Sequence, residues 1–232
     1  MSAKLDAGKK QAATKALDYV ERGMTLGIGT GSTARFFIDG LRDKIAAGWS
    51  FKGVPTSEET ERLAAAAGVD IITPDETTRI DLAIDGADEA DPDRNLIKGG
   101  GGALLREKIV ASAAEKFIVI ADKSKRVPAL GGFPLPVEIE PFAWALTIKA
   151  IRAALDESGY QDPNLQLRTL QGVPFRSDGG NLILDCSLER ITAPAALDAK
   201  LNAIAGVVET GLFCNMADVV IFGDEEGVSV DS

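Results

Sequence analysis

The chain has 232 residues, of which 45% are hydrophobic and 6% aromatic, and it carries a formal net charge of −10 with no histidine. This composition disfavours nucleic-acid and membrane partners, and it excludes Ser-His-Asp and Cys-His nucleophiles and the commonest zinc sites. Cys186 and Cys214 have neither disulfide-framework nor zinc spacing, and no secretory signal or membrane-length apolar run is visible, so we expect a cytoplasmic protein.

Strands and helices alternate along the first half of the chain. The strands are short apolar runs, and two of the helices are closed by glycine. Such alternation indicates a parallel sheet covered on both faces. The predicted strands are 25–29, 50–57, 69–73, 80–85 and 117–122, and the predicted helices lie within 5–23, 30–48, 58–68 and 103–116.

The pattern changes after residue 133. The elements predicted there are a strand at 135–140, a helix at 142–158, strands at 165–170 and 181–187, a helix at 194–205 and a strand at 207–213. This order is that of the ferredoxin-like split unit, and the apolar run 217–223 is expected to rejoin the first sheet. We therefore predict an α/β fold: a doubly wound, Rossmann-like domain over 1–133 and 214–232, with an inserted ferredoxin-like α+β domain over 134–213.

The first candidate loop is GIGTGSTA at 27–34, between a strand and a helix. Ligands of open parallel sheets bind at this end of the strands, and hydroxyls beside a helix N-terminus suit a compact phosphate. Two alternatives stay open: a hydroxyl simply caps the helix, or the glycine spacing belongs to a looser dinucleotide fingerprint, which alone is weak evidence. The hydroxyl-bearing residues are Thr30, Ser32 and Thr33.

The second loop is DGADEADPDRN at 85–95. From Asp91 it begins like a calcium-binding loop, but the required glycine and terminal glutamate are missing, so we expect DPDRN to be a solvated turn. Asp85 and Asp88 directly follow a buried strand. We expect them to belong to a site, although capping or ion pairing at the strand end is the alternative.

The third loop is KGGGGALLRE at 98–107. A glycine run before a helix lets backbone N–H groups converge on an anion. Glu107 lies on the apolar stripe of its helix, because Leu104 precedes it by three positions and Val110 follows by three. A carboxylate in such a place is either paired structurally or has a raised pKa.

In this order and spacing, GIGTGSTA, DGADE and KGGGGALLREK resemble ribose-5-phosphate isomerase of the A type. VIADKSK, FPLPVE and GVVETGLF extend the resemblance over nearly the whole chain, and the one departure is Gly102, where the family pattern predicts alanine. The resemblance implies reversible conversion of ribose 5-phosphate to ribulose 5-phosphate in the non-oxidative pentose phosphate pathway, without metal or organic cofactor. It also implies a homodimer or homotetramer.

The resemblance further assigns roles to single residues. Glu107 matches the catalytic base, which carries a proton from C2 to C1 through a cis-enediolate, and burial would raise its pKa from about 4.3 toward about 6–7. Lys98 and the glycine N–H groups would stabilise the enediolate, Asp85 would assist ring opening and Asp88 would orient hydroxyls. Lys9 is a weaker candidate for the phosphate. The implied substrate-binding residues are Thr30, Gly31, Ser32, Thr33, Asp85, Gly86, Ala87, Asp88, Lys98, Gly99, Gly100, Gly101 and Lys125.

Three other functions fit parts of the pattern. An amino-sugar-phosphate deaminase–isomerase would be expected to have a histidine in its site. A sugar-phosphate sensor would usually carry a helix-turn-helix segment, and the roughly 24 residues before the first strand are too short and insufficiently basic for one. A dinucleotide-dependent oxidoreductase is the third alternative.

Overall fold

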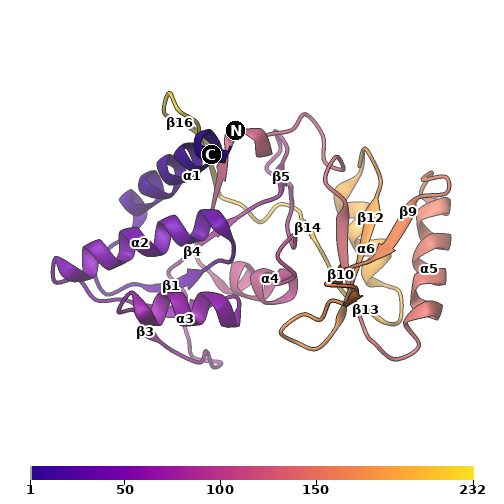
Figure 1. The fold of residues 1–232 in the computed structure, drawn as a ribbon, viewed down its shortest axis with the longest axis horizontal. Helices are drawn as coiled ribbons and strands as arrows, with labels where there is room; N and C mark the ends of the chain where they lie inside the picture. Colours follow the sequence, from indigo (N-terminus) through magenta and orange to yellow (C-terminus); the bar gives the residue numbers. More distant parts are fainter. Residues whose placement is uncertain (1) are drawn as a thin grey trace. The chain divides into compact units, whose positions relative to one another are not determined.

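The computed structural model describes residues 2–232, which divide into two compact units. Unit 1 comprises Met1–Ala87, Arg106–Arg126 and Asn215–Ser232. Unit 2 comprises Asp88–Leu105 and Val127–Cys214 (Figure 1). The chain therefore leaves unit 1 twice and returns to it twice.

A seven-stranded sheet in the order β16-β15-β7-β4-β1-β2-β3 forms the centre of unit 1. All its pairings are parallel except that of β16 with β15. The apolar runs predicted as strands form this sheet. Helices cover both of its faces, so the side chains on both sides of each strand are buried and the strand sequences are apolar throughout. The strands are β1 (Thr25–Ile28), β2 (Lys52–Pro55), β3 (Asp70–Ile71), β4 (Leu82–Gly86), β7 (Phe117–Asp122), β15 (Val219–Gly223) and β16 (Val228–Asp231).

Helices cover both faces of this sheet. The helices α1 (Ser2–Ala16), α2 (Ser32–Ala46) and α3 (Glu58–Ala66) share one hydrophobic core with Leu26, Ile84 and other residues of the strands. On the opposite face α4 (Leu104–Ala113) lies so close that a Cβ on Gly27 would be 2.4 Å from Val110 Cγ1. The predicted doubly wound α/β architecture is thereby confirmed.

A four-stranded antiparallel sheet in the order β13-β8-β12-β9 forms the centre of unit 2. Its elements follow one another in the predicted β-α-β-β-α-β order, and the strand order is that of the ferredoxin-like fold. The two helices and the sheet enclose a second hydrophobic core. The elements are β8 (Leu135–Ile139), α5 (Trp144–Glu157), β9 (Asn164–Leu167), β12 (Leu182–Ser187), α6 (Pro194–Asn202) and β13 (Val207–Thr210).

Unit 2 also holds strands that pair outside this sheet. The hairpin of β10 (Thr169–Leu170) and β11 (Val173–Pro174) stands by itself, so the predicted strand 165–170 is two separate strands. A three-stranded sheet joins β14 (Leu212–Phe213), β6 (Leu96–Ile97) and β5 (Glu89–Ala90). Because β5 and β6 pair with β14, residues 88–105 cluster with unit 2, whereas the sequence analysis assigned them to the first domain.

Two further elements differ from the prediction. The first α-helix ends at Ala16 and continues as a 3₁₀ turn, η1 (Leu17–Tyr19), rather than running to Gly23. The edge strand β16 was not predicted, because the segment that forms it is short and polar. The run 217–223 does rejoin the first sheet, as β15 beside β7.

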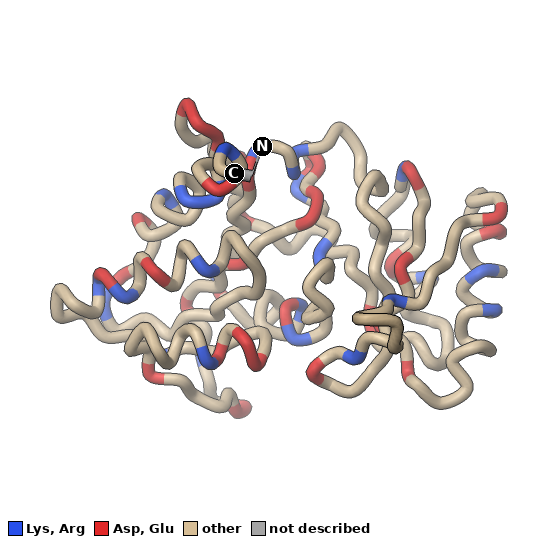
Figure 2. The backbone as a smooth tube through the Cα atoms, viewed as in Figure 1, with Lys and Arg blue, Asp and Glu red and all other residues tan. Residues whose placement is uncertain are grey.

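Acidic and basic residues are interspersed along the helices of both units (Figure 2). None of the helices within residues 2–232 combines the length and the apolar character that a membrane crossing requires.

Candidate functional site

The strand order of unit 1 reverses between β1 and β4, which are adjacent although two strands intervene in the chain. Ligands of open α/β sheets bind at such a switch point, beyond the carboxyl ends of the strands. The loop after β1 contains Thr30–Thr33, and β4 ends with Asp85 and Gly86. The structure therefore brings the first two predicted loops of unit 1 together.

The loop after β1 leads into the N-terminus of α2. Gly31 is its N-cap with φ +107°, a conformation that suits glycine, and Ser32 opens the helix. Ser32 is exposed and Thr33 half-buried. The N–H groups and positive dipole end of the first turn can therefore meet an anion from solvent. The N-cap position is held by Gly31, which has no side chain, so neither Ser32 nor Thr33 stands where a capping hydroxyl would.

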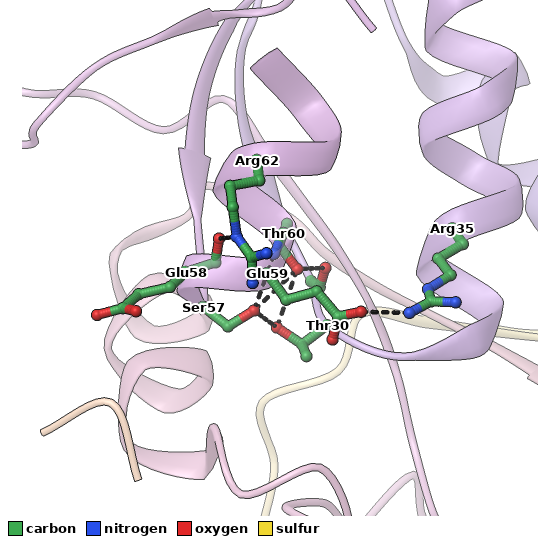
Figure 3. A network of polar contacts seen from close by, with 8 residues as sticks. Thr30, Arg35, Ser57, Glu58, Glu59, Thr60 and Arg62 are labelled. Carbon is green, nitrogen blue, oxygen red and sulfur yellow. Dashed lines mark hydrogen bonds and ion pairs between the residues drawn. The ribbon is translucent and has the colours of Figure 1, made fainter. Parts of the chain in front are cut away.

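Thr30 differs from its neighbours because its hydroxyl is turned inward, toward the N-terminus of α3 (Figure 3). Its Oγ1 lies 2.7 Å from Thr56 Oγ1, 2.8 Å from Ser57 Oγ and 3.1 Å from Thr60 Oγ1. Thr60 Oγ1 also donates to the Gly29 carbonyl at 3.0 Å. The sequence analysis missed these hydroxyls of VPTSEET; the signal was a helix-capping Ser57 directly after a strand.

Asp85 is 4% exposed and sits beside the first loop. Its Oδ1 accepts hydrogen bonds from the Thr30 N–H at 3.0 Å and from the Gly86 N–H at 2.7 Å. A Cβ on Gly29 would lie 2.0 Å from that oxygen, so the glycine makes room for the carboxylate. Asp85 thus binds the β1 loop to the end of β4.

Glu107 is 5% exposed on α4, as its place on the apolar stripe predicts. Together with Asp85 and Thr56 it lines a narrow cavity that is too tight to hold a water molecule and whose remaining walls are largely apolar. Unit 1 therefore places two acidic side chains around one cavity.

Two lysines lie toward the same edge of the sheet. Lys125 is half-buried in the 3₁₀ turn η2 (Lys123–Lys125), directly after β7, and Asp122 fixes this turn by accepting from the Ser124 N–H at 3.0 Å. Lys9 lies on α1 with its Nζ 3.5 Å from Asp6 Oδ1. Its neighbour Gly8 is so close to the end of β15 that a Cβ there would be 2.4 Å from the Gly223 carbonyl oxygen.

The remaining predicted residues belong to unit 2. Lys98 is 2% exposed, its N–H donates to the Gly211 carbonyl at 2.9 Å, and its Nζ lies 5.4 Å from the Phe213 ring centroid. Asp88 accepts from the Gly100 N–H at 2.8 Å through Oδ2. This hydrogen bond joins the acidic loop to the glycine run, a contact that the sequence did not predict.

One functional candidate of unit 2 was missed entirely. Arg168, which follows β9, donates through Nη1 to the carbonyls of Gly99 and Gly100 at 2.8 and 3.1 Å. No local pattern marks this arginine, because its partners lie 69 and 68 residues earlier in the chain. By contrast, DPDRN is the turn predicted from the sequence, with Asp91 accepting from the N–H groups of Asp93 and Asn95.

Comparisons with known proteins show the family of the chain. The family model described as ribose 5-phosphate isomerase A (phosphoriboisomerase A) matches residues 52–227. The chain is 50% identical over 226 residues to ribose-5-phosphate isomerase A of Nitrobacter hamburgensis, covering 97% of each chain. It is 53% identical over 219 residues to that of Sinorhizobium fredii, covering 94% of each.

Solved structures show the same similarity. The ribose 5-phosphate isomerase from Plasmodium falciparum superposes with a TM-score of 0.93 at 35% identity, covering 98% of both chains. A D-ribose-5-phosphate isomerase in complex with phospho-erythronic acid has a TM-score of 0.88 at 40% identity, covering 97% of both. With a family model over most of its length and relatives at about half identity, the chain belongs to the ribose 5-phosphate isomerase A family.

Proposed function

We propose that this protein interconverts D-ribose 5-phosphate and D-ribulose 5-phosphate, with Glu107 as the group that moves the proton. The observation that carries the proposal is the buried Glu107 carboxylate, which shares a cavity with Asp85 at the switch point of a parallel sheet. Family membership supports the substrate class, and the burial of Glu107 at this position supports its role as the base.

In the proposed reaction Glu107 takes the proton from C2 of the open-chain aldose. The electron pair of that C–H bond forms the C1–C2 double bond, and the carbonyl oxygen on C1 takes the negative charge. The enediolate then transfers the hydroxyl proton from O2 to O1, and Glu107 returns its proton to C1, which gives the ketose. A carboxylate with a pKa raised toward neutrality serves both transfers, because it is deprotonated often enough to act as base and still acidic enough to return the proton.

The phosphate of the substrate is proposed to bind at the N-terminus of α2. Ser32 and Thr33 would donate their hydroxyls, and Gly31 leaves the backbone N–H groups of the first turn accessible. Lys125 would add a positive charge, with Lys9 as a weaker candidate. Thr30 has a different role, because its hydroxyl is already held in the network with Thr56, Ser57 and Thr60 and its N–H in the bond to Asp85.

The sugar end is proposed to use the acidic loop and the glycine run. Lys98 and the N–H groups of the glycines would stabilise the enediolate oxygens, a contribution that typically lowers a barrier by about 2.7–4 kcal/mol per donor. Asp85 would assist opening of the furanose ring and Asp88 would orient hydroxyls. The relative whose solved complex contains phospho-erythronic acid supports this assignment, since the carboxylate of that compound is planar and anionic like an enediolate.

Three further parts of the proposal rest on the family and, for the location, on the sequence. We infer a homodimer or homotetramer, a cytoplasmic location, and a place in the non-oxidative pentose phosphate pathway. No metal or organic cofactor enters the proposed reaction, because the carboxylate and fixed N–H donors supply the proton transfer and the charge stabilisation that it needs.

The test is formation of ribulose 5-phosphate from ribose 5-phosphate in D₂O with EDTA present. We expect turnover, with solvent deuterium entering the ketose at C1. Glu107→Gln should lose more than roughly 10²-fold in kcat while still binding the substrate. The matched control is Glu115→Gln, an exposed glutamate that follows the same helix, which should keep the wild-type rate. An inactive wild-type protein, or an active Glu107→Gln variant, would contradict the proposal.

A further inference from the structure

Arg168 is held in one orientation by its own ion pair. Its guanidinium forms a bidentate contact with Asp185 on the neighbouring strand β12, with Nε 2.9 Å from Oδ2 and Nη2 bonded to Oδ1. The two side chains are only 16% and 24% exposed. Such a forked pair fixes the plane of the guanidinium, because two parallel hydrogen bonds define direction as well as distance.

The remaining amino group, Nη1, points at the glycine run. It donates to both the Gly99 and the Gly100 carbonyl, at 2.8 and 3.1 Å. All these groups belong to unit 2. The side chain therefore connects the ferredoxin-like sheet to the backbone of KGGGG.

By holding two carbonyls of the glycine run, Arg168 also fixes the direction of the N–H groups on the opposite side of the backbone. The described residues contain no cis peptide bond, and in a trans peptide the C=O and the N–H point in opposite directions. The Gly99 carbonyl and the Gly100 N–H belong to one peptide group. Arg168 donates to this carbonyl, and the N–H donates to Asp88 Oδ2 at 2.8 Å, so the peptide is held on both sides. The Gly100 carbonyl shares its peptide with the Gly101 N–H, which must point away from Arg168.

The Gly101 N–H is the group that remains for a ligand. Among residues 2–232 it has no hydrogen-bond acceptor in the chain, and Gly100 and Gly101 are both exposed. A cation on the carbonyl of a peptide also polarises its N–H and makes it a stronger donor. Without a side chain, a glycine run has many conformations, so a donor in it needs an external constraint to keep a single direction.

We propose that Arg168, oriented by Asp185, is a positioning residue that directs the Gly101 N–H at the enediolate oxygen of the substrate. The assignment rests on the proposed function, because it deepens the role given there to the glycine run. Arg168 itself touches neither the substrate nor the reacting atoms; it acts through the peptide between Gly100 and Gly101.

The experiment compares Arg168→Lys, which keeps the charge but loses the fork, with Arg176→Gln as the matched control. Arg176 lies on the same connection, is exposed, and donates only to the nearby Gly180 carbonyl. We expect Arg168→Lys to lower kcat by about 10²-fold with KM within about threefold, since misplacement of a donor costs this much in rate. In Arg168→Lys the affinity for phospho-erythronic acid should fall in parallel with kcat/KM. The control Arg176→Gln should leave kcat, KM and this affinity unchanged.

A second variant covers the case in which Arg168→Lys fails to fold. The pair Arg168→Gln/Asp185→Asn removes both charges together and leaves no buried charge without its partner. Equal falls in kcat and in phospho-erythronic acid affinity, with an unchanged Tm, support the proposal. An unchanged kcat in a folded variant, or a fall in Tm and a rise in KM with kcat retained, overturns it and indicates a structural role. Because wild-type turnover and the Glu107→Gln variant are measured in the same series, failure of the isomerase assignment itself would be seen separately.

Discussion

Gly29 and Asp85 are so close that residue 29 has no room for a side chain: a Cβ there would lie 2.0 Å from the Asp85 carboxylate oxygen and 2.5 Å from the Asp85 Cα. The second of these distances involves backbone, which cannot rotate away as a flexible side chain does. The end of β1 and the end of β4 therefore approach each other only because residue 29 has no side chain.

Gly29→Ala is accordingly expected to displace Asp85 and the hydrogen bond that it accepts from the Thr30 N–H. We expect kcat/KM to fall by about 10²-fold or more, because small displacements of positioned groups have large effects on rate. Gly179→Ala is the control, since a Cβ there meets only ordinary contacts at 3.5 Å or beyond. Steady-state kinetics of both variants test this, and wild-type kinetics for Gly29→Ala would contradict the interpretation.

Gly102 and Phe175 form a second such pair. The family pattern predicts alanine at position 102, but here φ is +82° and a Cβ would lie 2.4 Å from Phe175 Cε1. Gly102→Ala should lower the free energy of unfolding by more than the roughly 1–2 kcal/mol that a left-handed conformation costs a side chain.

Phe175→Ala in the same chain tests the origin of that loss. The double variant Gly102→Ala/Phe175→Ala should recover the part due to the collision, so a double-mutant cycle from urea unfolding should show a coupling of about 1 kcal/mol or more. Strictly additive effects would mean that the phenyl ring and the glycine do not constrain each other.

Glu138 is a buried carboxylate that is only half satisfied. It is 1% exposed; its Oε1 accepts from Ser177 Oγ at 2.7 Å and from Asn181 Nδ2 at 2.9 Å, whereas Oε2 has no partner among the described residues. Glu138→Gln keeps an oxygen that can accept both hydrogen bonds and exchanges the unpaired Oε2 for an amide NH2, so it should change the stability by no more than about 1 kcal/mol. Glu138→Ala should lower it by about 1–3 kcal/mol, since two buried donors lose their acceptor. Thermal unfolding of the two variants distinguishes these cases, and a large loss in Glu138→Gln would show that the charge itself is required.

Cys186 is expected to resist alkylation in the folded protein. Burial, and to a smaller extent the negative charge of Asp185, raise the pKa of its thiol far above the ordinary value. The reactive thiolate is therefore almost absent at neutral pH, and a fully buried sulfur is also inaccessible. In Cys214→Ser, where Cys186 is the remaining cysteine, iodoacetamide should label the chain only after denaturant is added; fast labelling of the native protein would disprove this.

The order of the elements and the position of the motifs were predictable from the sequence because both are local properties. Apolar runs of strand length, helices with one apolar stripe, and hydroxyls or glycines at a strand-to-helix junction depend on neighbours within a few residues. The same locality explains the failures. The edge strand β16 alternates valine with polar residues over only four positions, too few to predict a strand. Nothing near residues 88–105 shows that β5 and β6 pair with β14 from the other end of the chain.

By itself the sequence determined an α/β chain with a ferredoxin-like insertion, the three loops proposed to form the site, and the buried position of Glu107. Tertiary structure decided which groups meet. The Thr30 hydroxyl is held by α3 and the Gly29 position by Asp85, and the glycine run is fixed by Arg168. The physical reason is the range of the forces involved. Periodicity and capping act within a few residues, whereas these contacts join groups 26 to 69 residues apart and exist only once the sheet of each unit has formed.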